Sequence, residues 1–330
     1  MANKTDIEWT DFNWNFLRGC SRVSEGCRNC YAESVAARFS GVDPNGKELP
    51  YFGLAQMVNG KPRWTGEIKF IPAILEKPLH WTRPRKIFVN SMSDLFHEKV
   101  ADEVLDQAFA VMTLAPQHTY QILTKRPERM RDYMRKISDP GYFGPTLSEY
   151  EWLWSKGRGF GVTARWPAQN KSIWLGVSAE DQKTADERIP LLLDTPAAVR
   201  WVSAEPLLGP VDLEAVKVGC AHNSLYCACS APCEHSKLDW VVVGGESGPG
   251  ARPCDITWLR SIVHQCKAAS VPVFVKQLGA GKRENMLTRL QPVSSPGMQA
   301  GYVSYRDSKG GDMTEWPEDL RVREYPGGAE

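Results

Sequence analysis

Three cysteines within eleven residues mark the stretch Cys20-Ser-Arg-Val-Ser-Glu-Gly-Cys27-Arg-Asn-Cys30-Tyr31. The apolar run before it, residues 14–18, predicts a short strand. The run after it, residues 31–39, predicts a helix with Ala, Val and Phe on one side. The cysteines therefore lie between the end of a strand and the start of a helix. Because a helix N-terminus favours negative charge, this placement favours the thiolate form.

The number of cysteines in this stretch limits the kinds of site that it can form. A closed structural zinc site needs four ligands, and so does a four-iron cluster that only carries electrons. Three thiolates leave one metal position open for a substrate. Two other interpretations stay open at this point: a zinc site completed by a distant His or Cys, and three cysteines that have no shared role.

Composition narrows the class of protein. The 330 residues suffice for one large domain or two smaller ones, and 42% hydrophobic residues can form a large core. The formal net charge of +1 gives no global field that attracts nucleic acid, so any such surface must be local. We expect a cytoplasmic protein without a membrane span, because there is no apolar signal region and no run of eighteen apolar residues. Nine cysteines in that compartment indicate metal or redox chemistry rather than disulfides.

Strand-length apolar runs alternate with segments of helical period along most of the chain. Because such alternation is typical of parallel sheets, we predict an α/β fold: a full or partial TIM-type (β/α) barrel with parallel strands and irregular insertions. The expected strands are residues 14–18, 86–90, 119–123, 172–177, 199–202, 238–243 and 271–275. The expected helices are residues 31–39, 101–114, 127–137, 182–193 and 257–269.

Polar residues follow nearly every expected strand. In a (β/α) barrel the carboxyl ends of the strands form the active face, so polar residues there indicate chemistry. Helix N-capping favours Ser, Asp and Thr at the same positions, but it explains Glu or Lys there less well. The polar strand ends include Ser91, Ser93, Asp94, Lys125, Ser178, Glu180, Ser203, Glu205, Glu246 and Lys276.

Several segments interrupt the alternation. We expect a barrel over residues 1–278, with insertions at 41–85 and 138–171, and a C-terminal extension at 279–330 packed on it. The second insertion is rich in aromatic residues, which suit either a packed lobe or a lid that stacks on a base. Just before it, residues 125–136 carry six Lys and Arg, either a solvated helix face or a phosphate contact.

A second group of possible metal ligands lies within residues 220–235. Six side chains in sixteen residues are sufficient for a closed Cys/His zinc site, and an auxiliary iron–sulfur cluster is the rival interpretation. A set of free cysteines in a loop is the remaining possibility. The residues are Cys220, His222, Cys227, Cys229, Cys233 and His235.

Taken together, these motifs resemble the radical SAM superfamily, and most closely an uncharacterised phage-type group of radical-SAM-like proteins of unknown function. The spacing of the cysteines is six residues and then two, whereas three and then two is commonest in that superfamily. Asn29 stands where an aromatic residue is usual, and Tyr31 follows the last cysteine instead. The resemblance rests on Gly19-Cys, Gly26-Cys-Arg-Asn-Cys-Tyr-Ala32, Asn90-Ser-Met-Ser-Asp-Leu-Phe96, Leu123-Thr-Lys-Arg-Pro127, Ser203-Ala-Glu-Pro-Leu-Leu-Gly-Pro210, Gly244-Gly-Glu-Ser-Gly-Pro-Gly-Ala-Arg-Pro253 and Lys276-Gln277.

The resemblance implies a cofactor and a set of binding residues. Cys20, Cys27 and Cys30 would hold a [4Fe–4S] cluster, whose open iron binds the amino and carboxylate groups of S-adenosylmethionine. The glycine pair Gly244-Gly245 would let backbone approach the adenine closely. The other residues implied to contact the cofactor are Tyr31, Asn90, Ser91, Ser93, Asp94, Ser178, Glu180, Ser203 and Glu205.

The resemblance also implies a reaction. A reductant such as flavodoxin or ferredoxin would supply an electron for reductive cleavage of S-adenosylmethionine, and the 5′-deoxyadenosyl radical would abstract hydrogen from the substrate. The substrate class we expect is a nucleic-acid base or a nucleotide. Two rivals remain: a zinc-dependent hydrolase or nuclease, and a non-catalytic, metal-stabilised binding module. The candidates for substrate contact or proton transfer are Lys125, Glu246, Arg252 and Lys276.

Overall fold

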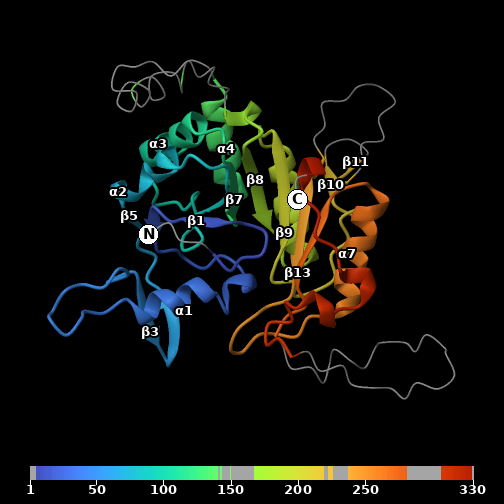
Figure 1. The fold of residues 1–330 in the computed structure, drawn as a ribbon, viewed down its shortest axis with the longest axis horizontal. Coiled ribbons are helices and arrows are strands. Elements are labelled where there is room, and N and C mark those ends of the chain that lie inside the picture. The colour runs from blue at the N-terminus through green and yellow to red at the C-terminus, as the bar shows by residue number, and fades with distance from the viewer. Residues whose placement is uncertain are drawn as a thin grey trace. The chain divides into compact units, whose positions relative to one another are not determined.

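Figure 1 shows a computed structural model of the chain, in which residues 5–139, 142, 149, 167–218, 222–225, 237–280 and 306–328 are described. The chain forms two compact units. The first unit contains Met1–Val177 and Pro190–Trp201, and the second contains Ser178–Ile189 and Val202–Glu330. Each unit is treated by itself below.

Seven strands form one sheet, and they neighbour one another in the order in which they occur along the chain. The pairs β1–β6, β6–β7, β7–β8 and β12–β13 are parallel. This connectivity confirms the predicted α/β class and is that of a partial (β/α) barrel. The strands are β1 (Phe12–Trp14), β6 (Lys86–Val89), β7 (Thr119–Thr124), β8 (Ile173–Ser178), β9 (Val199–Ala204), β12 (Trp240–Gly244) and β13 (Val273–Gln277).

Five longer helices occur where the helical spacing predicts them. Pro127 is the first residue of α4, a position that suits proline because the missing amide would have no partner there. The Asp255 carboxylate caps α7 by accepting a hydrogen bond from Thr257 N at 2.9 Å. The helices are α1 (Tyr31–Arg38), α3 (Asp102–Leu114), α4 (Pro127–Ile137), α6 (Gln182–Leu193) and α7 (Ile256–Ala268).

The first strand is earlier than predicted. β1 ends at Trp14, and Leu17–Arg18 form the separate strand β2, which pairs antiparallel with β5 (Lys69–Phe70). The cause is a side chain from another strand end: Asn90 Oδ1 accepts the hydrogen bond of Leu17 N at 3.1 Å. This contact holds β2 against the end of β6, and the chain has left the seven-stranded sheet before the cysteines.

The predicted insertion at 41–85 contains a β-hairpin packed on α1 (Figure 1). β3 (Ala55–Val58) and β4 (Lys61–Trp64) are joined by Asn59 and Gly60, whose φ angles are 50° and 71°. Positive φ at both turn residues is typical of a two-residue hairpin, for which Asn-Gly is the preferred sequence. Two short helices, α2 (Pro72–Leu75) and η2 (Lys77–His80), complete the insertion.

The remaining described elements are short. β10 (Lys217–Val218) pairs with β11 (His222–Asn223). Residues 322–324 run antiparallel beside β13, where Val275 N donates to Val322 O at 2.9 Å. Among the described residues, no helix is long and apolar enough to cross a membrane. Apart from its two ends and Tyr142 and Glu149, the insertion at 138–171 lies outside the described residues. The 3-10 turns are η1 (Glu25–Cys27), η3 (Pro167–Gln169), η5 (Met313–Glu315), η6 (Glu318–Leu320) and η7 (Pro326–Gly328).

The core of the first unit places a glycine against a tryptophan. A Cβ atom on Gly176 of β8 would lie 2.4 Å from Cε2 of Trp201, whose ring is fully buried. Trp201 in turn packs edge-on against Trp9, with ring centroids 5.3 Å apart. Gly176 is therefore fixed by packing rather than by backbone conformation.

We predict that Gly176→Ala destabilises the protein by about 1–3 kcal/mol, because the new methyl group collides with a buried indole that cannot withdraw. Urea unfolding followed by tryptophan fluorescence measures this. The matched control is Gly41→Ala, whose Cβ would meet nothing within 4 Å and should change the unfolding free energy by less than about 0.5 kcal/mol. Equal stability of the two variants would contradict the packing argument.

Candidate functional site

The cysteine loop, residues 20–30, leads from β2 into α1. Its three cysteines are unpaired and half-buried. Cys27 is the last residue of η1, and Cys30 is the N-cap residue of α1. The loop thus presents three thiols between a strand end and a helix start, and Cys30 stands at the positive end of the α1 dipole.

Burial is the main cause that raises the pKa of Cys20 and of Cys30. The pKa of Cys20 reaches about 12; the Asp94 carboxylate adds to the effect of burial, and the Arg126 guanidinium opposes it. The backbone amides of Glu33 and Ala32 lower the pKa of Cys30 through hydrogen bonds. Cys27 contributes charge repulsion to both thiols, so the three side chains are near enough to interact. Binding of a metal would displace their protons.

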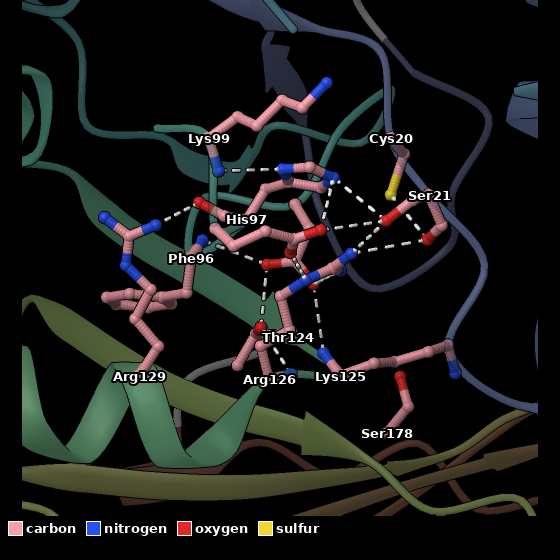
Figure 2. A network of polar contacts seen from close by, with 12 residues as sticks. Cys20, Ser21, Phe96, His97, Lys99, Thr124, Lys125, Arg126, Arg129 and Ser178 are labelled. Atoms are coloured by element: carbon pink, nitrogen blue, oxygen red, sulfur yellow. Dashed lines mark hydrogen bonds and ion pairs between the residues drawn. The ribbon is translucent and has the colours of Figure 1, made fainter. Parts of the chain in front are cut away.

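Asp94, which follows β6, is the centre of a buried polar network. Figure 2 shows the part of this network formed by Thr124, Arg126 and His97, beside Cys20. The Asp94 side chain is almost fully buried, and it accepts four hydrogen bonds. Oδ1 accepts from Thr124 Oγ1 at 2.7 Å and from Phe96 N at 3.0 Å. Oδ2 accepts from Lys125 N at 3.2 Å and from Arg126 Nη1 at 3.0 Å. These four donors fix the orientation of the Asp94 side chain.

Arg126 links Asp94 to the cysteine loop. Its Nη2 donates to Ser21 Oγ at 2.6 Å, and its Nε donates to Glu98 Oε2 at 2.8 Å. Figure 2 shows this guanidinium between the strand end and the residue that follows Cys20. The fold therefore places one positive charge beside the Cys20 thiol.

His97 completes the network. Its Nδ1 accepts from Lys99 N at 3.2 Å, so Nε2 carries the proton that faces Ser21 Oγ at 3.0 Å. Burial, followed by the charge of Arg126, lowers the pKa of His97, so the neutral ring is favoured. His97 thus orients Ser21 without adding charge.

The loop after β6 contains four residues implied as cofactor contacts. Asn90 has a φ of 58° and accepts from Leu17 N, while its Nδ2 is buried and makes no hydrogen bond among the described residues. Ser93 forms a parallel bridge to Gly19, directly before Cys20, and its buried Oγ has no partner within the described chain either. Tyr31 Oη donates to the backbone oxygen of Ser91 at 2.8 Å, which ties α1 to this loop.

The basic run at 125–136 is largely neutralised within the first unit. Arg126 pairs with Asp94 and Glu98, and Arg129 and Lys136 both pair with Asp102. Arg135 pairs with Asp194 at 2.6 Å. Arg131 pairs with Asp132 of the same helix, and the other carboxylates come from other elements. The charge of this run is therefore used within the fold more than it is available to an external phosphate.

In the second unit, two of the predicted residues form an ion pair. Lys276 Nζ lies 3.2 Å from Glu205 Oε1, and Ser203 Oγ donates to Glu205 Oε2 at 3.1 Å. Both charged side chains are largely buried. The ion pair joins the ends of β9 and β13, and the proton-transfer role of Lys276 stays a prediction.

The other predicted carboxylates of the second unit are bound by arginines of the same unit. Glu246 accepts from Arg252 N at 2.8 Å and Arg252 Nε at 3.0 Å. Glu180 is 1% exposed and pairs with Arg188 Nη1 at 3.1 Å, and this nitrogen also donates to the backbone oxygen of Ser178. Buried pairs of this kind hold elements together, so these residues have a structural role whatever else they contact.

The glycine pair has a packing role within the second unit. A Cβ on Gly245 would lie 2.5 Å from Leu278 O, and one on Gly244 would lie 2.9 Å from Glu205 Oε1. The sequence predicts that another group approaches this backbone closely. In the structure, the approaching groups are atoms of the chain itself, Leu278 O and Glu205 Oε1.

The second group of possible metal ligands lies outside the described residues, except for the backbone of His222 in β11. Within the part of the chain that the structure describes, no three His, Cys, Asp or Glu side chains are grouped so that they could hold a metal ion. The metal sites at 20–30 and 220–235 stay predictions.

Sequence reasoning missed three residues of the network: Ser21, His97 and the role of Arg126. His97 and Arg126 each belong to a polar strand end that was recognised, so their position was a usable signal. Their pairings with Ser21 join residues 76 and 105 positions apart, which no local sequence pattern indicates.

Comparison with known protein families gives one match over most of the chain. The family described as "Protein of unknown function (DUF5131)" matches residues 4–311. The chain belongs to this family. Neither the curated proteins nor the solved structures contain a match.

The assignment to the radical SAM superfamily is therefore wrong: the family found is DUF5131, whose description gives no function. The sequence already differs from the superfamily pattern in its cysteine spacing and in having Asn29 before the last cysteine. A short cysteine motif on an α/β chain is not sufficient to assign a family, because many families share that fold class.

We predict that Arg126→Met destabilises the protein by about 3–5 kcal/mol, because it leaves the buried Asp94 carboxylate without its counter-charge. The side chains of this pair are 10% and 8% exposed. The matched control on the same helix is Arg135→Met, whose ion pair with Asp194 is about half exposed and should contribute less than about 1 kcal/mol. Urea unfolding of both variants measures the difference; similar losses would show that the buried network is not special.

Proposed function

We propose that this protein is an iron–sulfur enzyme in which Cys20, Cys27 and Cys30 hold a four-iron cluster and the loop after β6 binds S-adenosylmethionine. The observation that carries the proposal is the juxtaposition of the three interacting thiols with two buried polar atoms that have no partner among the described residues, Asn90 Nδ2 and Ser93 Oγ. The bridge between Ser93 and Gly19 brings this loop to the residue before Cys20. The proposal rests on these side chains and not on membership of a protein family.

The donor set fits a cluster better than a single ion. In a four-iron cluster each thiolate binds its own iron, so the sulfurs stand farther apart than ligands that share one ion. The loop supplies three thiols, Cys20, Cys27 and Cys30, that affect one another electrostatically, and three is the number of protein ligands that leaves one iron of such a cluster open. The amides of Ala32 and Glu33 hydrogen-bond to Cys30, as is common for cluster sulfurs.

When bound, the cluster would supply the electron for reductive cleavage of S-adenosylmethionine, giving a 5′-deoxyadenosyl radical that abstracts hydrogen from a substrate. The residues of the chain bind and orient. The Asn90 amide can donate to a carboxylate oxygen, and the Ser93 hydroxyl can accept from an amino group. Arg126 offsets negative charge at Cys20, and its own position is fixed by Asp94.

The decisive experiment is anaerobic purification with measurement of iron, sulfide and zinc. Dithionite, or a flavodoxin or ferredoxin as partner, is then added with S-adenosylmethionine, and 5′-deoxyadenosine is quantified. We expect about four iron per chain from the cysteine loop, and the product only in the reduced sample. Cys20→Ala should lose both. The matched control, Cys266→Ala, removes a thiol buried in α7 and should retain both.

The outcomes separate the proposal from its rivals. Iron near eight per chain would indicate a second cluster at residues 220–235, and about one zinc beside the iron would indicate a zinc site there. Zinc alone, with S-adenosylmethionine untouched after iron and sulfide reconstitution, would refute the proposal and leave a zinc-dependent hydrolase or a binding module.

We predict that Ser93→Ala weakens binding of S-adenosylmethionine by about 3–10-fold, the loss of one hydrogen bond. Stability should be unchanged, because Ser93 Oγ has no hydrogen-bond partner in the described chain. Calorimetric titration of the reconstituted protein measures the affinity. The control is Ser40→Ala, whose hydroxyl already donates to Ala37 O at 2.9 Å. An unchanged affinity in Ser93→Ala would remove this loop from the binding site.

A further inference from the structure

A cavity of about 450 Å³ opens on the cysteine loop of the first unit. Most of its wall is the part of the loop between Cys20 and Cys30, and the hairpin strand β4 contributes the rest. None of these residues belongs to the polar network around Asp94. The lining residues are Arg22, Val23, Ser24, Glu25, Arg28 and Arg63.

The first arginine of this cavity is held rigidly. Arg22 Nε donates to Glu33 Oε1 at 3.1 Å, and its Nη2 contacts Glu33 Oε2 and donates to Arg28 O at 2.9 Å. Glu33 is 1% exposed and also accepts from Trp64 N at 2.7 Å. One buried carboxylate therefore fixes Arg22 and the end of β4, which carries Arg63, so the cavity is preorganised.

The three arginines of the cavity outnumber the carboxylates that line it. Arg63 Nη1 donates to Pro62 O at 3.0 Å and lies 4.0 Å from Glu33, and the Arg28 side chain is 61% exposed. The nearest carboxylate to Arg28 is Glu25 at 3.9 Å, and both of these side chains are mostly exposed. Glu33, 4.0 Å from Arg63 Nη1, is already saturated by Arg22 and Trp64. The cavity lining thus contains three arginines and one carboxylate, Glu25, whose contact with Arg28 is long and exposed.

The segment that contains the cavity residues carries a net positive charge, like the cavity lining itself. Residues 18–64 contain seven Arg and Lys against four Asp and Glu, a net charge of +3, whereas the whole chain carries +1. The segment also holds exposed rings, at Tyr31, Phe39 and Phe52, and the exposed large hydrophobic side chains of the described chain all fall between residues 23 and 58. Guanidinium forks bind phosphate oxygens, and exposed rings stack on bases.

We infer that this arginine cavity binds a phosphate group, carried by a nucleotide or by a single nucleic-acid strand. A concave site with several arginine forks suits the oxygens of a phosphate better than the broad face of an acidic protein. The claim that this phosphate belongs to the substrate of the enzyme rests on the proposed function. The claim that the cavity binds phosphate does not rest on it, because none of the cavity residues is a proposed cluster ligand.

The test uses the full chain without metal. Fluorescence anisotropy with a labelled single-stranded oligonucleotide gives the affinity over a series of salt concentrations. Arg28→Ala and Arg63→Ala should each weaken binding about tenfold or more, since a hydrogen bond to a charged group is lost. Each should also reduce the slope of log affinity against log salt by about 1. Arg38→Ala, the loss of an exposed charge at the end of α1 outside the cavity, should stay within about twofold of the unsubstituted protein.

Competition identifies the carrier of the phosphate. Displacement by adenosine monophosphate or inorganic phosphate assigns the site to free phosphate esters, and displacement by an unlabelled oligonucleotide alone assigns it to a strand. Absence of binding, or an equal loss in Arg38→Ala, overturns the inference. Iron content and 5′-deoxyadenosine formation of the same variants show whether the proposed function stands independently, because neither arginine is a proposed cluster ligand.

Discussion

The buried carboxylate of Asp94 is the constraint on which the rest of the first unit depends. It receives donors from the ends of two neighbouring strands and holds the guanidinium of Arg126 in a place where an unpaired charge would be costly. Through Arg126 the same carboxylate reaches Ser21, so the start of the cysteine loop is fixed by a residue more than seventy positions away. The carboxyl ends of β6 and β7 and the cysteine loop are thereby joined by one hydrogen-bond network.

Different groups of the fold affect the pKa values of Cys20 and Cys30. Burial disfavours charge at Cys20, and Asp94 adds to that effect, whereas Arg126 partly compensates. At Cys30 the compensation comes from backbone amides of α1 instead of a side chain. The two thiols thus depend on different parts of the fold for the stability of their thiolate forms, one on a long-range ion pair and the other on a local helix terminus.

Most of the fold could be predicted from the sequence, because its strands are continuous apolar runs and its helices begin at recognisable residues such as Pro127. The hairpin at 55–64 was missed although Asn59-Gly60 is a strong turn signal. The early end of β1 could not be predicted, since it depends on the side chain of Asn90 contacting Leu17 N.

The candidate site was predicted in position more than in detail. Asp94 and Ser93 were recognised as polar strand ends, but the partners of Arg126 join distant segments and leave no local trace. The assignment to a superfamily was wrong, because three cysteines and alternating strands and helices occur in many unrelated proteins.

Glu33 shows how one side chain can govern several segments. In the sequence it resembles an ordinary helix residue. Its carboxylate nevertheless accepts hydrogen bonds both from Arg22 of the cysteine loop and from Trp64 N of the hairpin. A substitution at Arg22 alone leaves the buried Glu33 carboxylate without its closest counter-charge, and one at Glu33 alone releases both Arg22 and Trp64 N. Evolutionary change at these two positions should therefore be concerted, and the hairpin should be inherited together with the cysteine loop as one module.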